Sequence, residues 1–153
     1  KTGLTGDCTT NADCKEAGKY CKIEGKNENS CSVPTTGTCE TLDSGISKIY
    51  NGKTFLYSSG KMSWWATRNW CLAHGKSLAS LSDLGITGGY EDGYCDGDAC
   101  TGADWDALTA AFGYSYYWTN YSYDSCLAFI VGANDQTVGN NYRFYNFHFA
   151  LCR

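Results

Sequence analysis

The chain has little proline, few charges toward its C-terminus and no long apolar run. Only one proline occurs among 153 residues, Pro34, and the stretch 116–153 contains neither proline nor lysine. No apolar segment approaches the ~20 residues that a membrane-spanning helix needs, which predicts that this chain has no transmembrane segment. The net charge of −4 comes without a basic stripe, so nucleic acid is not expected as a partner.

Motifs of common enzyme classes are also missing. The sequence has no Gly-x-Ser-x-Gly, no His-Glu-x-x-His and no phosphate-binding loop. Its two histidines, His74 and His148, lie far apart along the chain and lack catalytic or metal-ligating neighbours. We therefore expect structural roles for both histidines, and we predict that the protein is not an enzyme.

Cysteine, in contrast, is abundant. Ten cysteines in a chain of this size indicate disulfides formed in an oxidising compartment, which predicts an extracellular or cell-surface protein. Zinc binding is the competing interpretation, but no paired Cys-x-x-Cys knuckles occur. Cys95 and Cys100 are expected to close the loop between them. The residue pattern leaves the pairing of six others open: Cys8, Cys14, Cys21, Cys31, Cys39 and Cys126.

Residues 1–40 differ in composition from residues 41–153. The first region holds five cysteines among few apolar residues, so it is expected to depend on cross-links for its stability. Because five is an odd number, either one of these cysteines bridges to the second region or one is free, and Cys39, the nearest to the boundary, is the candidate for the bridge. The chain starts at Lys1 without a signal-peptide pattern, which predicts a mature or trimmed ectodomain whose N-terminal anchor, if it had one, has been removed.

Local patterns predict an α+β fold for residues 41–153. Ser63 and Gly75 have the residue types of a helix N-cap and C-terminal stop, and Asp104 and Gly113 bound a second helix in the same way. The run Ser58-Ser59-Gly60 is expected to end a strand. The expected elements are a strand at 53–58, a helix at 64–74, a helix at 104–112, a strand at 125–131 and a strand at 142–152.

The stretch 116–153 is crowded with Tyr, Asn, Phe and Ser. Tyr offers contact area at low entropic cost, and Asn and Ser offer adaptable hydrogen bonding, which is typical of a recognition surface. A Tyr-rich sheet that is merely well packed is the alternative, although buried strands favour Val, Ile and Leu. If 142–152 is one strand, Phe144 and His148 share one face and Arg143 and Tyr145 share the other. An inward-pointing Cys152 would make the first face core and leave Arg143 and Tyr145 exposed.

Several segments together resemble the C-type lectin-like fold. Phe55-Leu56-Tyr57, the run MSWWATRNWCLAHGKSLASL at 62–81, Tyr117-Trp118-Thr119 and Phe149-Ala150-Leu151-Cys152 are similar to its first strand, first helix, tryptophan-containing strand and last strand. The resemblance covers residues 50–153 and implies two helices, small antiparallel sheets and a disulfide from Cys71 to Cys152. The Glu-Pro-Asn and Trp-Asn-Asp motifs of calcium-dependent sugar binders are missing, which indicates a compact member without the long calcium loop.

Within the compact group, the C-terminal stretch resembles proteins that diversity-generating retroelements of bacteria and phages diversify. The similarity lies in Tyr117-Trp118-Thr119-Asn120, Tyr123-Asp124-Ser125 and the Asn-rich run from Gly139 to Phe147. In that family, adenine-rich template codons for Asn mutate to codons for Tyr, Asp, Ser, Phe and others. Residues of largely these types interrupt the Asn pattern here, which predicts a variable surface.

These resemblances imply a bacterial adhesin or display protein without a cofactor. We expect it to bind a protein or glycan on another cell, or on a phage or host surface. The residues expected to contact the ligand are Tyr121, Tyr123, Asp124, Phe129, Asn140, Asn141, Tyr142, Arg143, Phe144, Tyr145 and Asn146.

Two alternatives remain at the level of sequence. The acidic, Gly-rich loop at 84–104 provides candidate calcium ligands in Asp92, Asp96 and Asp98, which would make the protein a calcium-dependent lectin. An EF-hand loop that starts at Asp92 is excluded, because its third and twelfth positions would be Tyr94 and Ala103 instead of calcium ligands. The other alternative is a pilin-like structural subunit that assembles with its own copies and has no ligand.

Overall fold

The structure, a computed structural model, describes residues 8–23 and 36–153. The two α-helices and the strands confirm the predicted α+β class. No helix in these ranges is long and apolar enough to cross a bilayer. The elements, in chain order, are η1 (Asn11–Asp13), β1 (Lys19–Ile23), β2 (Gly37–Thr41), β3 (Ile46–Tyr50), β4 (Lys53–Met62), α1 (Trp64–Ala73), η2 (Ser82–Leu84), β5 (Cys95–Asp96), η3 (Gly97–Ala99), α2 (Trp105–Phe112), β6 (Tyr116–Ser122), β7 (Leu127–Gly132), β8 (Thr137–Tyr142) and β9 (His148–Cys152).

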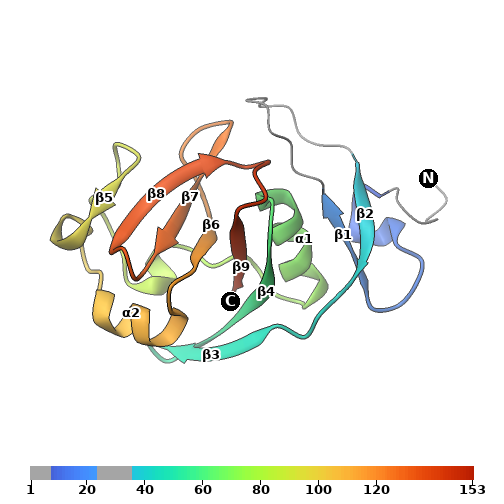
Figure 1. The fold of residues 1–153 in the computed structure, drawn as a ribbon, viewed down its shortest axis with the longest axis horizontal. Coiled ribbons are helices and arrows are strands. Elements are labelled where there is room, and N and C mark those ends of the chain that lie inside the picture. Colours follow the sequence, from blue (N-terminus) through green and yellow to red (C-terminus); the bar gives the residue numbers. More distant parts are fainter. Residues whose placement is uncertain (1–7, 24–35) are drawn as a thin grey trace.

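The last strand of the chain lies inside the larger sheet (Figure 1). Seven strands follow the order β3-β4-β9-β6-β7-β8-β5, and β1 pairs with β2 in a separate sheet. β9 is antiparallel to β4 but parallel to β6, where Tyr117 is opposite Phe149. The sheet is therefore mixed, and the expectation of small antiparallel sheets was wrong for this pair of strands.

The first helix begins and ends where its capping residues predict. The Ser63 side chain accepts a hydrogen bond from the backbone N–H of Ala66 at 3.1 Å, which satisfies one free donor of the first turn. Gly75 follows the helix with φ of +71°, a conformation that favours glycine. In α2, Asp104 likewise accepts from Ala107 at 3.1 Å, and Gly113 terminates the helix.

The helices cover opposite faces of the sheet. Trp70 of α1 packs in a core that contains Trp118, and Phe112 of α2 packs in a core that contains Tyr117. Because adjacent residues of a strand point to opposite faces, Tyr117 and Trp118 fix the two cores relative to each other. The indole N–H of Trp118 donates to the Met62 carbonyl at 2.8 Å, so this fully buried ring has its polar atom satisfied.

Strand β4 is longer than predicted. The Asn51-Gly52 turn, with φ of +53° and +75°, joins it to β3, a strand that the sequence analysis missed. The run Ser58-Ser59-Gly60 does not end β4 but forms an irregularity in its pairing with β9. There the Ser58 hydroxyl accepts from the Ala150 N–H at 2.9 Å and donates to the Gly60 carbonyl at 2.8 Å. Because of this contact between distant segments, the strand continues through a run of residues that was expected to end it.

The predicted single strand at 142–152 was also wrong. β8 ends at Tyr142 and β9 begins at His148, and the residues between them turn. Two backbone bonds hold the start of the turn: the Arg143 N–H donates to Cys126 at 3.0 Å, and the Arg143 carbonyl accepts from Trp64 at 2.7 Å. Phe144 and His148 are buried as predicted, and Arg143 and Tyr145 are only half-exposed.

The N-terminal hairpin β1–β2 packs against α1 (Figure 1). The Ser63 hydroxyl donates to the Ile23 carbonyl at 3.0 Å, and the Asn69 amide donates to the Cys21 carbonyl at 3.0 Å. Both bonds are buried, and Tyr20 joins the core formed with α1. The Cys-rich region and the rest of the chain therefore share an apolar contact. Cys31 and Pro34 lie outside the described residues.

Four disulfides are placed within the described residues. Cys71–Cys152 and Cys95–Cys100 pair as predicted. Cys8–Cys21 and Cys14–Cys39 hold the N-terminal hairpin. The expectation that Cys39 bridges to the second region was wrong, because pairing of β1 with β2 brings Cys39 beside the segment that follows η1. Cys126 is also disulfide-bonded.

Removal of the Cys71–Cys152 bridge should destabilise the fold more than removal of Cys95–Cys100. The two bridges close sequence separations of 81 and 5 residues. Chain-entropy estimates give about 4.5 kcal/mol for the first and about 2 kcal/mol for the second. Chemical denaturation of the Cys71→Ala/Cys152→Ala and Cys95→Ala/Cys100→Ala variants measures both losses. Equal losses would contradict a dominant role for the longer bridge.

Candidate ligand-binding surface

Three segments that are distant in sequence meet near the ends of strands β6 and β8. In Figure 1 the connections that follow β6 and β8 lie together at the top of the view. The Arg143 N–H donates to the Cys126 carbonyl at 3.0 Å, and the Asn140 side chain donates to the Gly93 carbonyl at 2.7 Å. The segments, called the recognition edge below, are residues 90–94, 121–126 and 142–147.

Exposed aromatic side chains gather on the recognition edge. Exposure reaches 56% for Tyr94, 51% for Tyr121, 42% for Tyr123 and 53% for Phe147. Among the described residues, these four account for half of the eight large apolar side chains that are exposed. Tyr121 and Tyr123 were predicted as ligand contacts, whereas Tyr94 and Phe147 were missed. Phe147 adjoins the predicted Asn146, which is itself exposed.

A first aromatic cluster consists of Tyr90, Tyr121, Tyr123 and Phe129. The Tyr121 ring stacks on Phe129 with centroids 5.3 Å apart, and Tyr123 meets Phe129 edge-on at 5.6 Å. Tyr90 contacts both Tyr121 and Phe129. Phe129 is only 1% exposed. This residue, predicted to contact the ligand, therefore supports the exposed tyrosines from beneath.

The loop at 90–94 fits closely over this cluster. Gly93 has φ of +97°, and a Cβ at this position would lie 3.0 Å from both the Tyr123 ring and the Asn140 side chain. The Tyr123 hydroxyl also donates to the Asp92 carbonyl at 3.4 Å. A side chain larger than glycine would push the loop away from the tyrosine.

A second aromatic cluster lies in the turn between β8 and β9. Tyr142 stacks on Phe144 at 5.6 Å, and Tyr145 contacts both rings and also Phe147 at 5.2 Å. Phe144 is only 3% exposed and forms the base of this cluster. Of the predicted contacts here, Tyr142 and Tyr145 are half-exposed and present parts of their rings to solvent.

Arg143 connects the two loops of the recognition edge to α1. Its Nη2 donates to the Asp124 carbonyl at 3.0 Å and to the Ser122 hydroxyl. The guanidinium lies 4.9 Å from the Trp64 ring centroid, a cation–π distance. Burial lowers the pKa of Arg143, and the nearby Asp124 opposes that change. This predicted ligand contact therefore has its Nη2 engaged within the protein, whereas its buried Nε has no hydrogen-bond partner among the described residues.

Asp124, Asn140 and Asn141 have different structural roles. The Asp124 carboxylate accepts from the backbone N–H groups of Cys126 and Leu127 at 2.8 and 2.9 Å, which orders the β6–β7 loop. Asn140 and Asn141, as neighbours on β8, point to opposite faces. Asn140 faces the 90–94 loop, and Asn141 points into the core beside His148.

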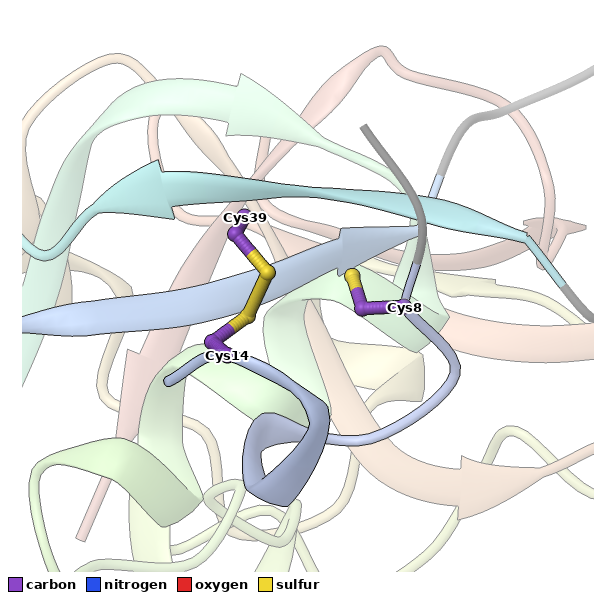
Figure 2. Close-up of side chains that lie close together, drawn as sticks. All are labelled: Cys8, Cys14 and Cys39. Carbon is purple, nitrogen blue, oxygen red and sulfur yellow. A yellow bond between two sulfur atoms is a disulfide. The ribbon is translucent and has the colours of Figure 1, made fainter. Parts of the chain in front are cut away.

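The candidate calcium ligands do not converge. Asp92, Asp96 and Asp98 form no group of three within metal-ligating distance. In residues 8–23 and 36–153, the only side chains grouped in this way are Cys8, Cys14 and Cys39 (Figure 2). These sulfurs are committed to disulfides, Cys8 with Cys21 and Cys14 with Cys39.

Both histidines have the contacts of packed structural residues. His74 bonds through Nε2 to the Asp43 carbonyl at 2.9 Å and contacts Trp70. His148 is buried against Trp118, and its Nε2 lies 2.9 Å from Asn141 Nδ2. Burial, with a smaller effect from the charge of Lys61, lowers the pKa of His148 to about 4.

A scan against protein-family models found no matching family, and a search of curated proteins found no match. The shape and chemistry of the recognition edge are therefore the basis for a functional conclusion.

Acidification should destabilise the protein through His148. Its pKa is about 4 when folded and about 6.5 when unfolded, so the unfolded chain binds more protons between these values. The contribution of neutral His148 to stability is complete above about pH 6.5 and is lost as pH falls toward about 4.

The measurement is the free energy of unfolding of the wild type and His148→Gln across pH 4–7. The difference between the two should shrink with falling pH by at most about 1.4 kcal/mol per pH unit. Carboxylates such as Asp83 titrate in both proteins and cancel in the difference. Parallel pH curves would contradict a depressed His148 pKa.

Proposed function

We propose that this protein is a secreted or cell-surface binding protein that recognises a protein or glycan through the recognition edge. The concentration of exposed tyrosine and phenylalanine there is the observation that supports it most directly. Apolar side chains that are exposed together in one region, rather than singly, are typical of interaction sites. The disulfides are consistent with an oxidising extracellular compartment.

The mixture of side chains suits recognition of varied ligands. Tyrosine rings present broad amphipathic faces and lose little conformational entropy when they bind. Here two rings of the recognition edge stack on buried aromatic rings: Tyr121 on Phe129 and Tyr142 on Phe144. Such support restricts the rings before a ligand arrives, which lowers the entropic cost of binding.

We further propose a compact C-type lectin-like fold diversified by a retroelement. The order of elements and the Cys71–Cys152 bridge between α1 and β9 support the fold assignment. The position of Tyr121, Tyr123 and Asn146 on exposed segments supports the second part, because none of the three side chains belongs to either core. An adhesin or display protein of a bacterium or phage fits both parts.

The binding role predicts that alanine at Tyr121, Tyr142 and Tyr145 together weakens ligand binding. Loss of three aromatic contacts should reduce affinity by at least about tenfold, since central aromatic anchors each contribute about 1–2 kcal/mol or more. The measurement compares the wild type and the triple variant on arrays of immobilised glycans and proteins, with circular dichroism as the check of folding.

A matched control replaces three exposed apolar residues elsewhere, Ile49, Leu72 and Tyr114, with alanine. This variant should bind like the wild type. The site assignment fails if the recognition-edge variant is folded and keeps every array signal of the wild type, or if both variants lose the same signals.

Diversification predicts a signature in DNA. The 3′ end of the coding sequence should have a nearby near-copy that differs only at adenines, next to a reverse-transcriptase gene. Differences should fall in codons for exposed residues such as Tyr121 and Tyr123 and spare codons for Trp118 and Cys152. Sequencing the locus checks this, and a locus without the near-copy removes the retroelement from the proposal while leaving the binding role in place.

A further inference from the structure

A small cavity opens within the first aromatic cluster. Its volume is about 160 Å³, and its lining consists of Glu91, Tyr121, Ser122, Tyr123 and Phe129. The lining residues come from the 90–94 loop, the end of β6, the loop that follows it and β7. Phe129 is buried in the lining, with the exposed Tyr121 ring stacked on it and the exposed Tyr123 ring edge-on to it.

The rim of the cavity is acidic. One Glu91 carboxylate oxygen accepts from the Gly89 N–H at 2.8 Å, and none of the ion pairs made by the described residues includes Glu91. Burial raises the pKa of the adjacent Tyr90, and the proximity of Tyr121 and Glu91 raises it further.

Glu91 is the charged residue of the lining, and other charged residues adjoin the lining residues. Asp92 follows Glu91 on the same loop, and Asp124 lies on the loop opposite. The nearby cation is Arg143, which donates to the Ser122 hydroxyl. Its guanidinium is stacked on Trp64 and close to Asp124. The lining itself therefore carries one carboxylate, that of Glu91, and no cation.

We propose that this cavity binds the cationic end of a lysine or arginine side chain on a protein partner. The inference rests on the proposed binding role and specifies the ligand class for part of the recognition edge. Aromatic faces attract an ammonium or guanidinium through the ring quadrupole, and a carboxylate at the rim adds a charge-assisted hydrogen bond. A neutral sugar would stack on the same rings but leave the Glu91 charge without a counterion.

The cavity is preformed rather than assembled on binding. Tyr90 contacts Tyr121 and Phe129, Gly93 fits against Tyr123, and the Glu91 carboxylate is fixed by the backbone of Gly89. Preorganised walls reduce the entropy lost when a flexible side chain is captured. A partner would insert one basic side chain here while its neighbouring surface covers the remainder of the recognition edge.

The test titrates the intact protein with four small probes and follows the aromatic NMR signals of Tyr121 and Tyr123. The probes are the Nα-acetyl amides of lysine, arginine, norleucine and aspartate. The lysine or arginine probe should bind with a Kd of about 1–10 mM, a range typical of a single small contact. The norleucine and aspartate probes should bind at least about fivefold more weakly, and added salt should weaken only the cationic probes.

Variants separate the contributions of charge and ring. Glu91→Gln should weaken the cationic probes about 2- to 5-fold, and Tyr121→Leu should do the same by removing a ring face. Tyr121→Phe keeps the ring and should stay within about twofold of the wild type. The matched control is Glu40→Gln, the same chemical change at an exposed carboxylate of β2.

Three results would overturn the cation site: equal shifts with lysine and norleucine probes, tighter binding of the aspartate probe, or no difference between Glu91→Gln and Glu40→Gln. Its failure is distinct from failure of the binding role. If array binding depends on the three tyrosines but the probes show no preference for a cation, only the cation site is contradicted. If the cationic probes bind but the triple variant keeps all array signals of the wild type, only the role of the wider recognition edge is contradicted.

Discussion

The structure depends on the last strand, which lies between two parts of the sheet that are built from earlier segments of the chain. β9 pairs with β4 on one side and with β6 on the other. Without it, the β3–β4 hairpin and the strands β6, β7, β8 and β5 would have no common sheet. The bridge from Cys71 to Cys152 fixes β9 to α1, and Leu151 and Ala150 contribute to the two opposite cores.

This constraint explains how a surface of aromatic residues can remain ordered. β9 is fixed along its length, and the turn before it is held by the backbone of Arg143, which bonds to both Cys126 and Trp64. Trp118 and Thr119 anchor β6 in the same way, through bonds to Met62 and Phe129. Buried residues of the framework, Trp118 and Thr119 before one loop and His148 after the other, therefore hold the loops of the recognition edge in place.

The sequence predicted correctly those elements whose ends are set by residues adjacent in the chain, namely the two helices. Both helices begin at a capping side chain and end at a glycine, and both were placed correctly from Ser63 and Asp104 onward. Pairing of Cys71 with Cys152 came from the resemblance, whereas the pairing of Cys14 with Cys39 could not be read from spacing. Disulfide connectivity depends on which strands meet, and the β1–β2 pairing was not predicted.

The errors arise where a distant contact overrides a local pattern. Alternating aromatic and polar residues at 142–152 are typical of a strand, but bonds from Arg143 to Cys126 and Trp64 turn the chain. Ser58 likewise continues β4 through a bond to Ala150. At the candidate site, residue type alone could not separate Tyr121, which is exposed, from Phe129, which lies beneath it.

The central claim is that residues 116–153 divide into a rigid framework and an outer surface whose side chains are free to change. A deep mutational scan of this segment, sorted for correctly folded protein at a cell surface, tests it most directly. Nearly all substitutions should be tolerated at Tyr121, Tyr123 and Asn146, and few at Trp118 and Leu151. Comparable loss of folded protein at both sets of positions would contradict the division.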